Sequence, residues 1–253
     1  MSIIDEKAAW DILQKFSEDC REIDSSSLIA IYATGSLPGG YYRPGQSDID
    51  AVLIIKNGSE DVWGNSEKPS KALEELNRQY LEMYQIPKDF GPFPLQESEL
   101  FPPYDPENDF LTQEITRLKF QGKLVYGNFD LEEIPLPSIE NILADAKHFE
   151  EWWRDQFSIA TKVEGMSPEA CVNTILIHLR RFLQIKRGVI EFNKLKVVAT
   201  YLDNEPPFIN SEALRLVTDS LALQILTDDD IEFLRGYVEE LRSKMNVHLG
   251  IFM

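Results

Sequence analysis

The stretch that decides how this chain folds is ATGSLPGGYYRPGQSDIDAVLI, residues 33–54. Asp48 and Asp50 stand one residue apart at the start of an otherwise apolar segment, directly after a turn rich in glycine. Side chains two positions apart lie on the same face of a strand, so the two carboxylates repel each other. Aspartate is also a poor strand former. We therefore expect a cation to compensate for the negative charge at the entrance to this strand.

Two adjacent carboxylates suit a divalent cation, and Mg²⁺ is usually held by one or two carboxylates together with substrate phosphates. The turn upstream suits those phosphates, because turns that contain glycine expose backbone N–H groups. Gly35 and Ser36 follow a short apolar segment, and Ser47 offers a second hydroxyl. A phosphate site facing a metal site indicates displacement at phosphorus, in which the metal stabilises the attacking and leaving oxygens.

Three further side chains of the turn each have two interpretations. Arg43 lies between the glycines and the aspartates, where it either neutralises a bound triphosphate or is a solvated loop arginine. Tyr41 and Tyr42 either stack on a nucleotide base or pack the turn against the body of the domain. We count Arg43 among the candidate nucleotide-binding residues.

Around this stretch, strand patterns alternate with helix patterns as far as Gly127. The predicted elements are a helix over 5–23, strands over 28–33 and 47–55, and helices over 69–84 and 107–120. Residues 86–106 contain six prolines and can supply at most an edge strand, because proline lacks the N–H of a central strand.

After Gly127 the strand patterns give way to longer helical ones, predicted over about 138–160 and 167–187. We therefore expect an α+β chain. A small mixed β-sheet with flanking helices forms a catalytic domain in residues 1–127, and an all-helical bundle follows in residues 128–253.

Composition narrows the class of protein. The chain has 253 residues, of which 43% are hydrophobic, so it can bury a sizeable core. Its formal net charge of −18 repels a phosphate backbone, so nucleic acid is not an expected partner. Two isolated cysteines suit the reducing cytoplasm, and no apolar run approaches the roughly 18 residues of a membrane span. No GxxxxGK[ST] sequence occurs, which excludes a P-loop nucleotide site.

The central stretch resembles a known family. GS at 35–36, then eleven residues, then DID at 48–50 followed by AVLII is similar to the hG[GS]…Dh[DE]h signature of the DNA polymerase β-like nucleotidyltransferase superfamily. A compact catalytic domain before a helical domain resembles the aminoglycoside adenylyltransferases in that superfamily. The sharp match covers about residues 31–55, and EITRLKFQGKLVYG at 114–127 resembles the helix and turn between the domains of those enzymes.

The resemblance implies roles for four residues of this stretch. Gly35 and Ser36 would hold the phosphates of the nucleotide, and Asp48 and Asp50 would bind Mg²⁺. It also implies a third carboxylate on a later strand, which holds metal or acts as a base toward the acceptor hydroxyl.

Three residues are candidates for that third carboxylate: Asp89, Glu97 and Glu99. Asp89 has the better spacing from the aspartate pair, whereas Glu97 lies in the clearer alternation of side chains. None of the three stands between apolar residues as the family pattern favours, so catalysis is less strongly indicated than the fold.

The function implied by the resemblance is Mg²⁺-dependent transfer of a nucleoside monophosphate, AMP from ATP, to a hydroxyl of a small-molecule acceptor, with release of pyrophosphate. The acceptor would lie between the two domains, and the acidic chain favours a cationic one. Two alternatives stay open. One is a catalytically weak or inactive module that binds a regulatory partner, which the poor context of the third acid favours. The other is an adenylyltransferase that modifies proteins.

Overall fold

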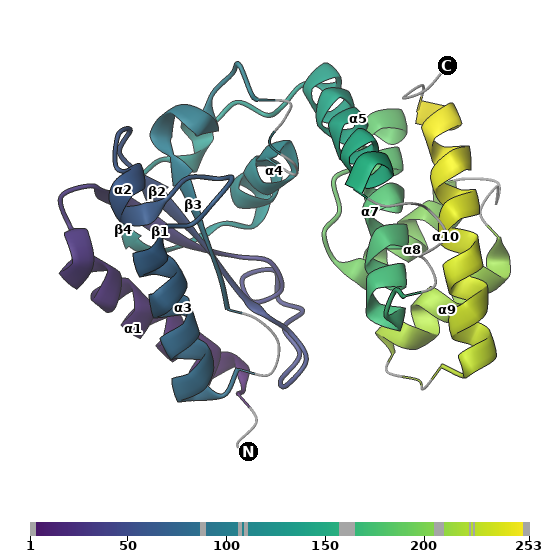
Figure 1. The fold of residues 1–253 in the computed structure, drawn as a ribbon, viewed down its shortest axis with the longest axis horizontal. Helices are drawn as coiled ribbons and strands as arrows, with labels where there is room; N and C mark the ends of the chain where they lie inside the picture. Colours follow the sequence, from purple (N-terminus) through teal and green to yellow (C-terminus); the bar gives the residue numbers. More distant parts are fainter. Residues whose placement is uncertain are drawn as a thin grey trace. The chain divides into compact units, whose positions relative to one another are not determined.

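The chain forms two compact units, Met1–Asn141 and Ile142–Met253. They are seen in a computed structural model (Figure 1). The structure describes residues 4–86, 90–105, 108, 111–156, 165–204, 210–222, 224 and 226–249. The division falls after Asn141, whereas the sequence pattern places the domain boundary after Gly127. The segment between them belongs to the first unit, because Ile134 is buried in its core and Pro135 O accepts a hydrogen bond of 3.1 Å from the Tyr104 hydroxyl.

The first unit is built on a mixed four-stranded sheet with strand order β3-β2-β1-β4 (Figure 1). Its strands are β1 (Leu28–Thr34), β2 (Ile49–Ile55), β3 (Phe90–Gln96) and β4 (Lys123–Gly127). β1 runs antiparallel to β2 and β4, and β3 runs parallel to β2. The prediction of a small mixed sheet with flanking helices is confirmed.

β3 lies at an edge of this sheet, as the prolines of its segment predicted. Pro92 pairs with Ala51 and Pro94 with Leu53. An edge strand tolerates two residues without an N–H because only one of its sides needs a hydrogen-bonded neighbour. The proline pattern therefore placed this strand correctly.

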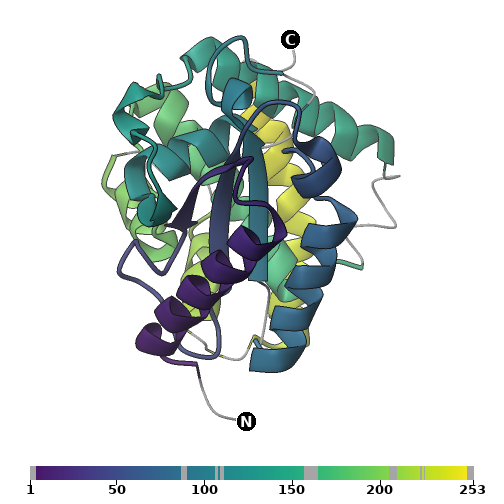
Figure 2. The same cartoon turned by 90° about the vertical axis from the view of Figure 1, so that its left-hand side faces the viewer.

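Helices cover both faces of the sheet. The first face is covered by α1 (Glu6–Asp24) and α3 (Lys71–Tyr84), which lie side by side in front of the strands in Figure 2. The opposite face is covered by α4 (Leu111–Gln121). Because side chains alternate along a strand, Ile49, Ala51, Leu53 and Ile55 enter the first core and Val52 and Ile54 enter the second.

Polar side chains mark where the first two of these helices begin. Asp5 accepts a hydrogen bond of 2.8 Å from Ala8 N at the start of α1, and Ser70 accepts one of 3.2 Å from Leu73 N at the start of α3. Each such cap satisfies a backbone N–H that has no partner inside the helix, and contributes about 1 kcal/mol.

Three short elements complete the first unit: α2 (Glu60–Trp63), η1 (Glu97–Leu100) and η2 (Leu131–Glu133). The sequence pattern treated residues 56–68 as loop and did not predict β4. In β4 the side chains of Lys123 and Leu124 are exposed, so the strand lacks the alternation of buried and exposed residues that marks a strand in sequence.

Helices are the only regular elements among the described residues of the second unit, which confirms the predicted helical region. Its helices are α5 (Ile139–Gln156), α7 (Pro168–Arg187), α8 (Lys194–Asn204), α9 (Ser211–Leu221) and α10 (Asp228–Leu249). α5 begins just before the division between the units. Ser167 caps α7 by accepting from Ala170 N at 3.1 Å, and Gly188 ends it in the left-handed conformation with φ +63°. α7 buries side chains against α8, α9 and α10, so it is the central helix of the bundle.

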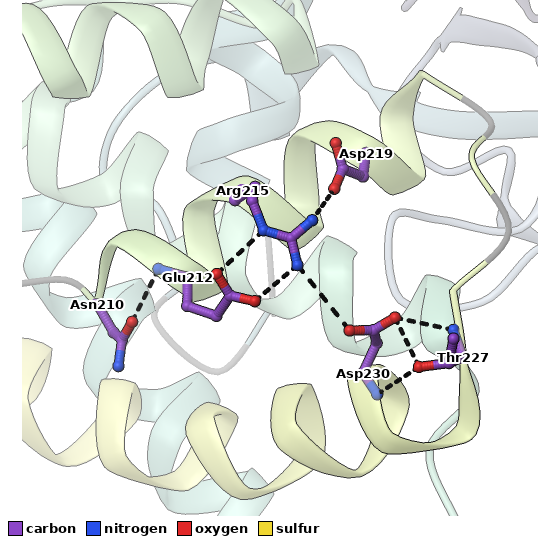
Figure 3. Close-up of polar contacts among 6 residues, drawn as sticks. All are labelled: Asn210, Glu212, Arg215, Asp219, Thr227 and Asp230. Carbon is purple, nitrogen blue, oxygen red and sulfur yellow. Dashed lines mark hydrogen bonds and ion pairs between the residues drawn. The ribbon is translucent and has the colours of Figure 1, made fainter.

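A polar network joins α9 to the start of α10 (Figure 3). Arg215 pairs with Glu212 and Asp219 of its own helix, and its Nη2 lies 4.0 Å from Asp230 Oδ1. Asp230 and Thr227 cap α10 reciprocally, because each side chain accepts a hydrogen bond from the other's backbone N–H. Among the helices that the structure describes, none has the length and apolar character to cross a membrane.

Candidate active site

Asp50 stands at the centre of the candidate site, because three strands meet around it. It is the second residue of β2, and it pairs with Thr34, the last residue of β1, and with Gly91 of β3. Its side chain points to the same face of the sheet as Val52 and Ile54, which is the face covered by α4.

Two glycines leave room for the Asp50 carboxylate. A Cβ atom added at Gly35 would lie 2.1 Å from Asp50 Oδ2, and one added at Gly91 would lie 3.4 Å from Oδ1. Gly35 also has φ +73°, which residues with a side chain rarely adopt. The first turn residue after β1 is thus in close contact with the proposed metal ligand. Nothing in the pattern of residues 86–106 pointed to Gly91.

Ser36, the residue after Gly35, supplies a buried hydroxyl. Its Oγ atom is buried and has no hydrogen-bond partner within the described part of the chain. The carbonyl groups of Gly35 and Ser36 are engaged inside the turn, since they accept hydrogen bonds from Gly39 N at 3.2 Å and Tyr41 N at 3.1 Å. A buried polar group without a partner costs about 1–3 kcal/mol, so a ligand oxygen at this hydroxyl would be stabilised.

The second half of the turn is closed by Ser47. Its hydroxyl accepts a hydrogen bond of 3.0 Å from Arg43 N, and its own N–H donates to Arg43 O at 2.9 Å. The Ser47 hydroxyl therefore shapes the segment that leads into β2. The roles of Arg43 and Ser47 in nucleotide binding stay predictions.

The two tyrosines of the turn pack it against the rest of the unit. The Tyr41 hydroxyl is 3.2 Å from Nε2 of Gln121 at the end of α4. The Tyr42 hydroxyl donates to Ile4 O at 3.4 Å, and the ring contacts the core beneath α1. Burial raises the pKa of Tyr42, and the negative charge of Asp48 raises it further. Asp48 itself is exposed and directly precedes β2.

Glu97 and Glu99 follow the end of β3 that is distant from Asp50, a placement that disfavours the prediction that Glu97 is a catalytic residue. Because β3 is parallel to β2, Gly91 lies beside Asp50 and Gln96 beside Ile55. At about 3.3 Å per residue, Gln96, which ends β3 just before Glu97, is about 17 Å along the strand from Gly91.

The third candidate acid, Asp89, lies outside the described residues. It directly precedes Phe90, the first residue of β3, which pairs with Ile49. No group of three histidine, cysteine, aspartate or glutamate side chains gathers to hold a metal among the residues that the structure describes.

A cation that sequence reasoning missed faces Asp50. Arg117 of α4 places Nη1 3.7 Å from Asp50 Oδ2 and forms a hydrogen-bonded ion pair with Glu114, one turn earlier in the helix. Burial lowers the pKa of Arg117, but the charges of Glu114 and Asp50 outweigh this and raise it overall. The Glu114–Arg117 pair has the i,i+3 spacing that a helix predicts, whereas the contact with Asp50 has no local signal.

These residues fit a magnesium ion that arrives with phosphates. Asp48 and Asp50 offer the hard oxygen ligands that Mg²⁺ prefers, and the ion commonly takes its remaining ligands from phosphates and water. The buried Ser36 hydroxyl and the close approach at Gly35 lie on the turn that would receive those phosphates.

The chain is similar to known proteins in structure but not detectably in sequence. No protein-family model matches the sequence, and no curated protein matches it. A spectinomycin adenyltransferase from Enterococcus faecialis, solved with ATP and spectinomycin, matches with a TM-score of 0.55 and 18% identity, covering 91% of this chain and 99% of the other. A toxin-antitoxin complex solved with AMP-PNP matches over 58% of this chain and 89% of the other, with 16% identity and a TM-score of 0.29, too low to compare folds. The chain thus shares its fold with that adenyltransferase, as the order of a compact catalytic domain before a helical domain predicted.

Proposed function

We propose that this protein is a Mg²⁺-dependent nucleotidyltransferase that moves AMP from ATP to a hydroxyl group of a small-molecule acceptor and releases pyrophosphate. One observation carries the proposal. The Asp50 carboxylate is in close contact with Gly35, the residue before Ser36, whose buried hydroxyl has no hydrogen-bond partner among the described residues. The similar adenyltransferase was solved with ATP and with an acceptor, spectinomycin, which supports the two classes of substrate.

The proposal gives each residue of the site a separate role. Asp48 and Asp50 hold the metal, and Ser36 donates its hydroxyl hydrogen to a phosphate oxygen. Arg43 and Ser47 contact the nucleotide from the second half of the turn. Mg²⁺ held there would supply positive charge that stabilises the negative charge of the phosphates. Most of the rate enhancement comes from alignment of the reacting groups.

Asp89 is our candidate for the base that removes the proton from the acceptor hydroxyl. Glu97 and Glu99 follow the far end of β3, so they are unsuitable, whereas Asp89 precedes the strand at the end that pairs with β2 beside Asp50. We further propose a cytoplasmic location, since Cys20 and Cys171 are free buried thiols and ATP is abundant there.

Isothermal titration calorimetry with a non-hydrolysable ATP analogue, with and without Mg²⁺, tests the binding step. We expect the wild type to bind the analogue only with metal, and Asp50→Asn to lose at least about a hundredfold in affinity. Asp11→Asn is the matched control, because it removes the same charge from an exposed helical site paired with Lys7. An Asp50→Asn variant that binds as tightly as the control would refute the proposal.

A second measurement separates transfer from binding. Pyrophosphate release from ATP is followed over a panel of cationic and neutral hydroxyl acceptors, with Asp89→Asn as the comparison. Binding without release over the whole panel would favour the alternative of a regulatory, non-catalytic module. Label from ATP that appears on protein in a cell extract would indicate a protein acceptor instead.

A further inference from the structure

Asp50 has a cationic neighbour before any metal binds. Arg117 Nη1 lies 3.7 Å from Oδ2 of Asp50, the same oxygen that is in close contact with Gly35. The side chains of Arg117 and Asp50 are 25% and 23% exposed, so solvent screens their attraction only in part. The guanidinium thereby offsets part of the negative charge of Asp50.

Glu114 competes with Asp50 for the same guanidinium. It forms a hydrogen-bonded ion pair with Arg117, and its side chain is 16% exposed. A guanidinium presents several donors in a fixed plane, so it can contact two carboxylates at once. Glu114 and Asp50 therefore divide the charge of Arg117 between them, and a change at either carboxylate alters the interaction with the other.

We propose that Arg117 is a positioning residue that makes metal binding depend on nucleotide. This inference rests on the proposed function, in which Asp50 is a metal ligand. Held near Oδ2, the guanidinium competes with a divalent cation for Asp50, so the free protein binds metal weakly. A metal that arrives with a triphosphate brings further ligands and overcomes this competition. Glu114 moderates the competition by drawing Arg117 toward itself.

The proposal predicts opposite effects of two substitutions in the same ion pair. Arg117→Gln removes the competing cation, so Mn²⁺ alone binds about tenfold more tightly to the free protein. Glu114→Gln leaves the guanidinium to Asp50, so Mn²⁺ binds about threefold more weakly. Loss of a merely structural contact would weaken metal binding in both variants.

Mn²⁺ binding is measured on the full chain by electron paramagnetic resonance, with and without the ATP analogue. Arg78→Gln is the matched control, because Arg78, like Arg117, pairs with a glutamate three residues earlier in its helix, Glu75, and with a second carboxylate, Glu82. Arg117→Lys keeps the charge and should bind Mn²⁺ as the wild type does. Thermal unfolding of each variant shows that it is folded.

The outcomes separate this inference from the proposed function. If Mn²⁺ binds with the analogue in an Asp50-dependent way, but Arg117→Gln binds Mn²⁺ alone no more tightly than Arg78→Gln, only the inference is overturned. Tighter binding in Glu114→Gln would overturn it as well. If Mn²⁺ does not bind even with the analogue, both fall.

Discussion

Gly35→Ala is the substitution that tests the site most directly, because the new methyl group has nowhere to go. Its Cβ would lie 2.1 Å from Oδ2 and 3.2 Å from Cγ of Asp50, so the carboxylate must move. Gly40 in the same turn provides a matched control. It has φ +72°, close to the φ of +73° at Gly35, and an added Cβ there meets nothing within 4 Å.

Both substitutions strain the backbone, and only Gly35→Ala also creates a steric clash. A left-handed φ costs a residue with a side chain about 1–2 kcal/mol, and both variants incur this strain. Gly35→Ala also overpacks the site, which adds about 2 kcal/mol. We expect a total loss of about 3–4 kcal/mol for Gly35→Ala and about 1–2 kcal/mol for Gly40→Ala. Affinity for the Mg²⁺–nucleotide complex should fall at least about tenfold in the first variant and stay near wild type in the second.

A double-mutant cycle tests whether contact with Asp50 causes the larger loss of stability in Gly35→Ala than in Gly40→Ala. In Asp50→Ala the nearest remaining Asp50 atom to the new methyl group would be Cβ at 3.5 Å, an ordinary van der Waals contact. In that background, Gly35→Ala should cost no more than Gly40→Ala to within about 0.5 kcal/mol. The free energy of unfolding of the first unit is measured from hydrogen exchange of the slowest amides in β1 and β2. Equal costs for the two glycines in the wild type, or an excess that persists without the carboxylate, would refute the reasoning.

Three further predictions concern single side chains. Ser36→Ala should leave the free energy of unfolding unchanged or raise it by up to about 1 kcal/mol, because the buried hydroxyl that it removes has no hydrogen-bond partner among the described residues. The same substitution should lower nucleotide affinity about tenfold, and urea denaturation and calorimetry measure the two effects. Glu97→Gln should leave calorimetric nucleotide affinity unchanged, since Glu97 follows the far end of β3, and a loss above about threefold would contradict this placement. Hydrogen bonds from Ser26 and Ser27 lower the pKa of Asp24 from 3.8 to about 2. A carboxyl whose pKa is lowered by folding stabilises the protein above its ordinary pKa and loses this contribution as pH falls through the folded value. Wild type should therefore lose stability relative to Asp24→Asn between about pH 4 and pH 2 in acid denaturation, and parallel curves would contradict the assignment.

Much of the fold follows from local patterns. Helical periodicity placed α1 and α3 within a few residues, and the prolines of residues 86–106 required β3 to be an edge strand. β4 escaped prediction because an edge strand with exposed side chains has no periodic pattern to detect.

For the candidate site as well, local sequence patterns identified some features and could not identify others. The DxD spacing and the preceding Gly-Ser indicated where the site lies, because both depend on the alternation of side chains and on turn chemistry. The choice among the three candidate acids required the register of β3 on β2, which places Glu97 far from Asp50. Strand register depends on how the buried faces and connections of two segments distant in sequence fit together, so the order of residues within one segment does not reveal it.

What the sequence by itself determined is the set of residues that share a strand face, a helix face or a turn, because these depend on backbone geometry over a few residues. Only the tertiary structure decided which groups surround Asp50: Gly35 and Gly91 in close contact with its carboxylate, and Arg117 within 3.7 Å of it. Steric exclusion and charge attraction depend on distance in space, and packing of α4 on the sheet brings the guanidinium to that carboxylate.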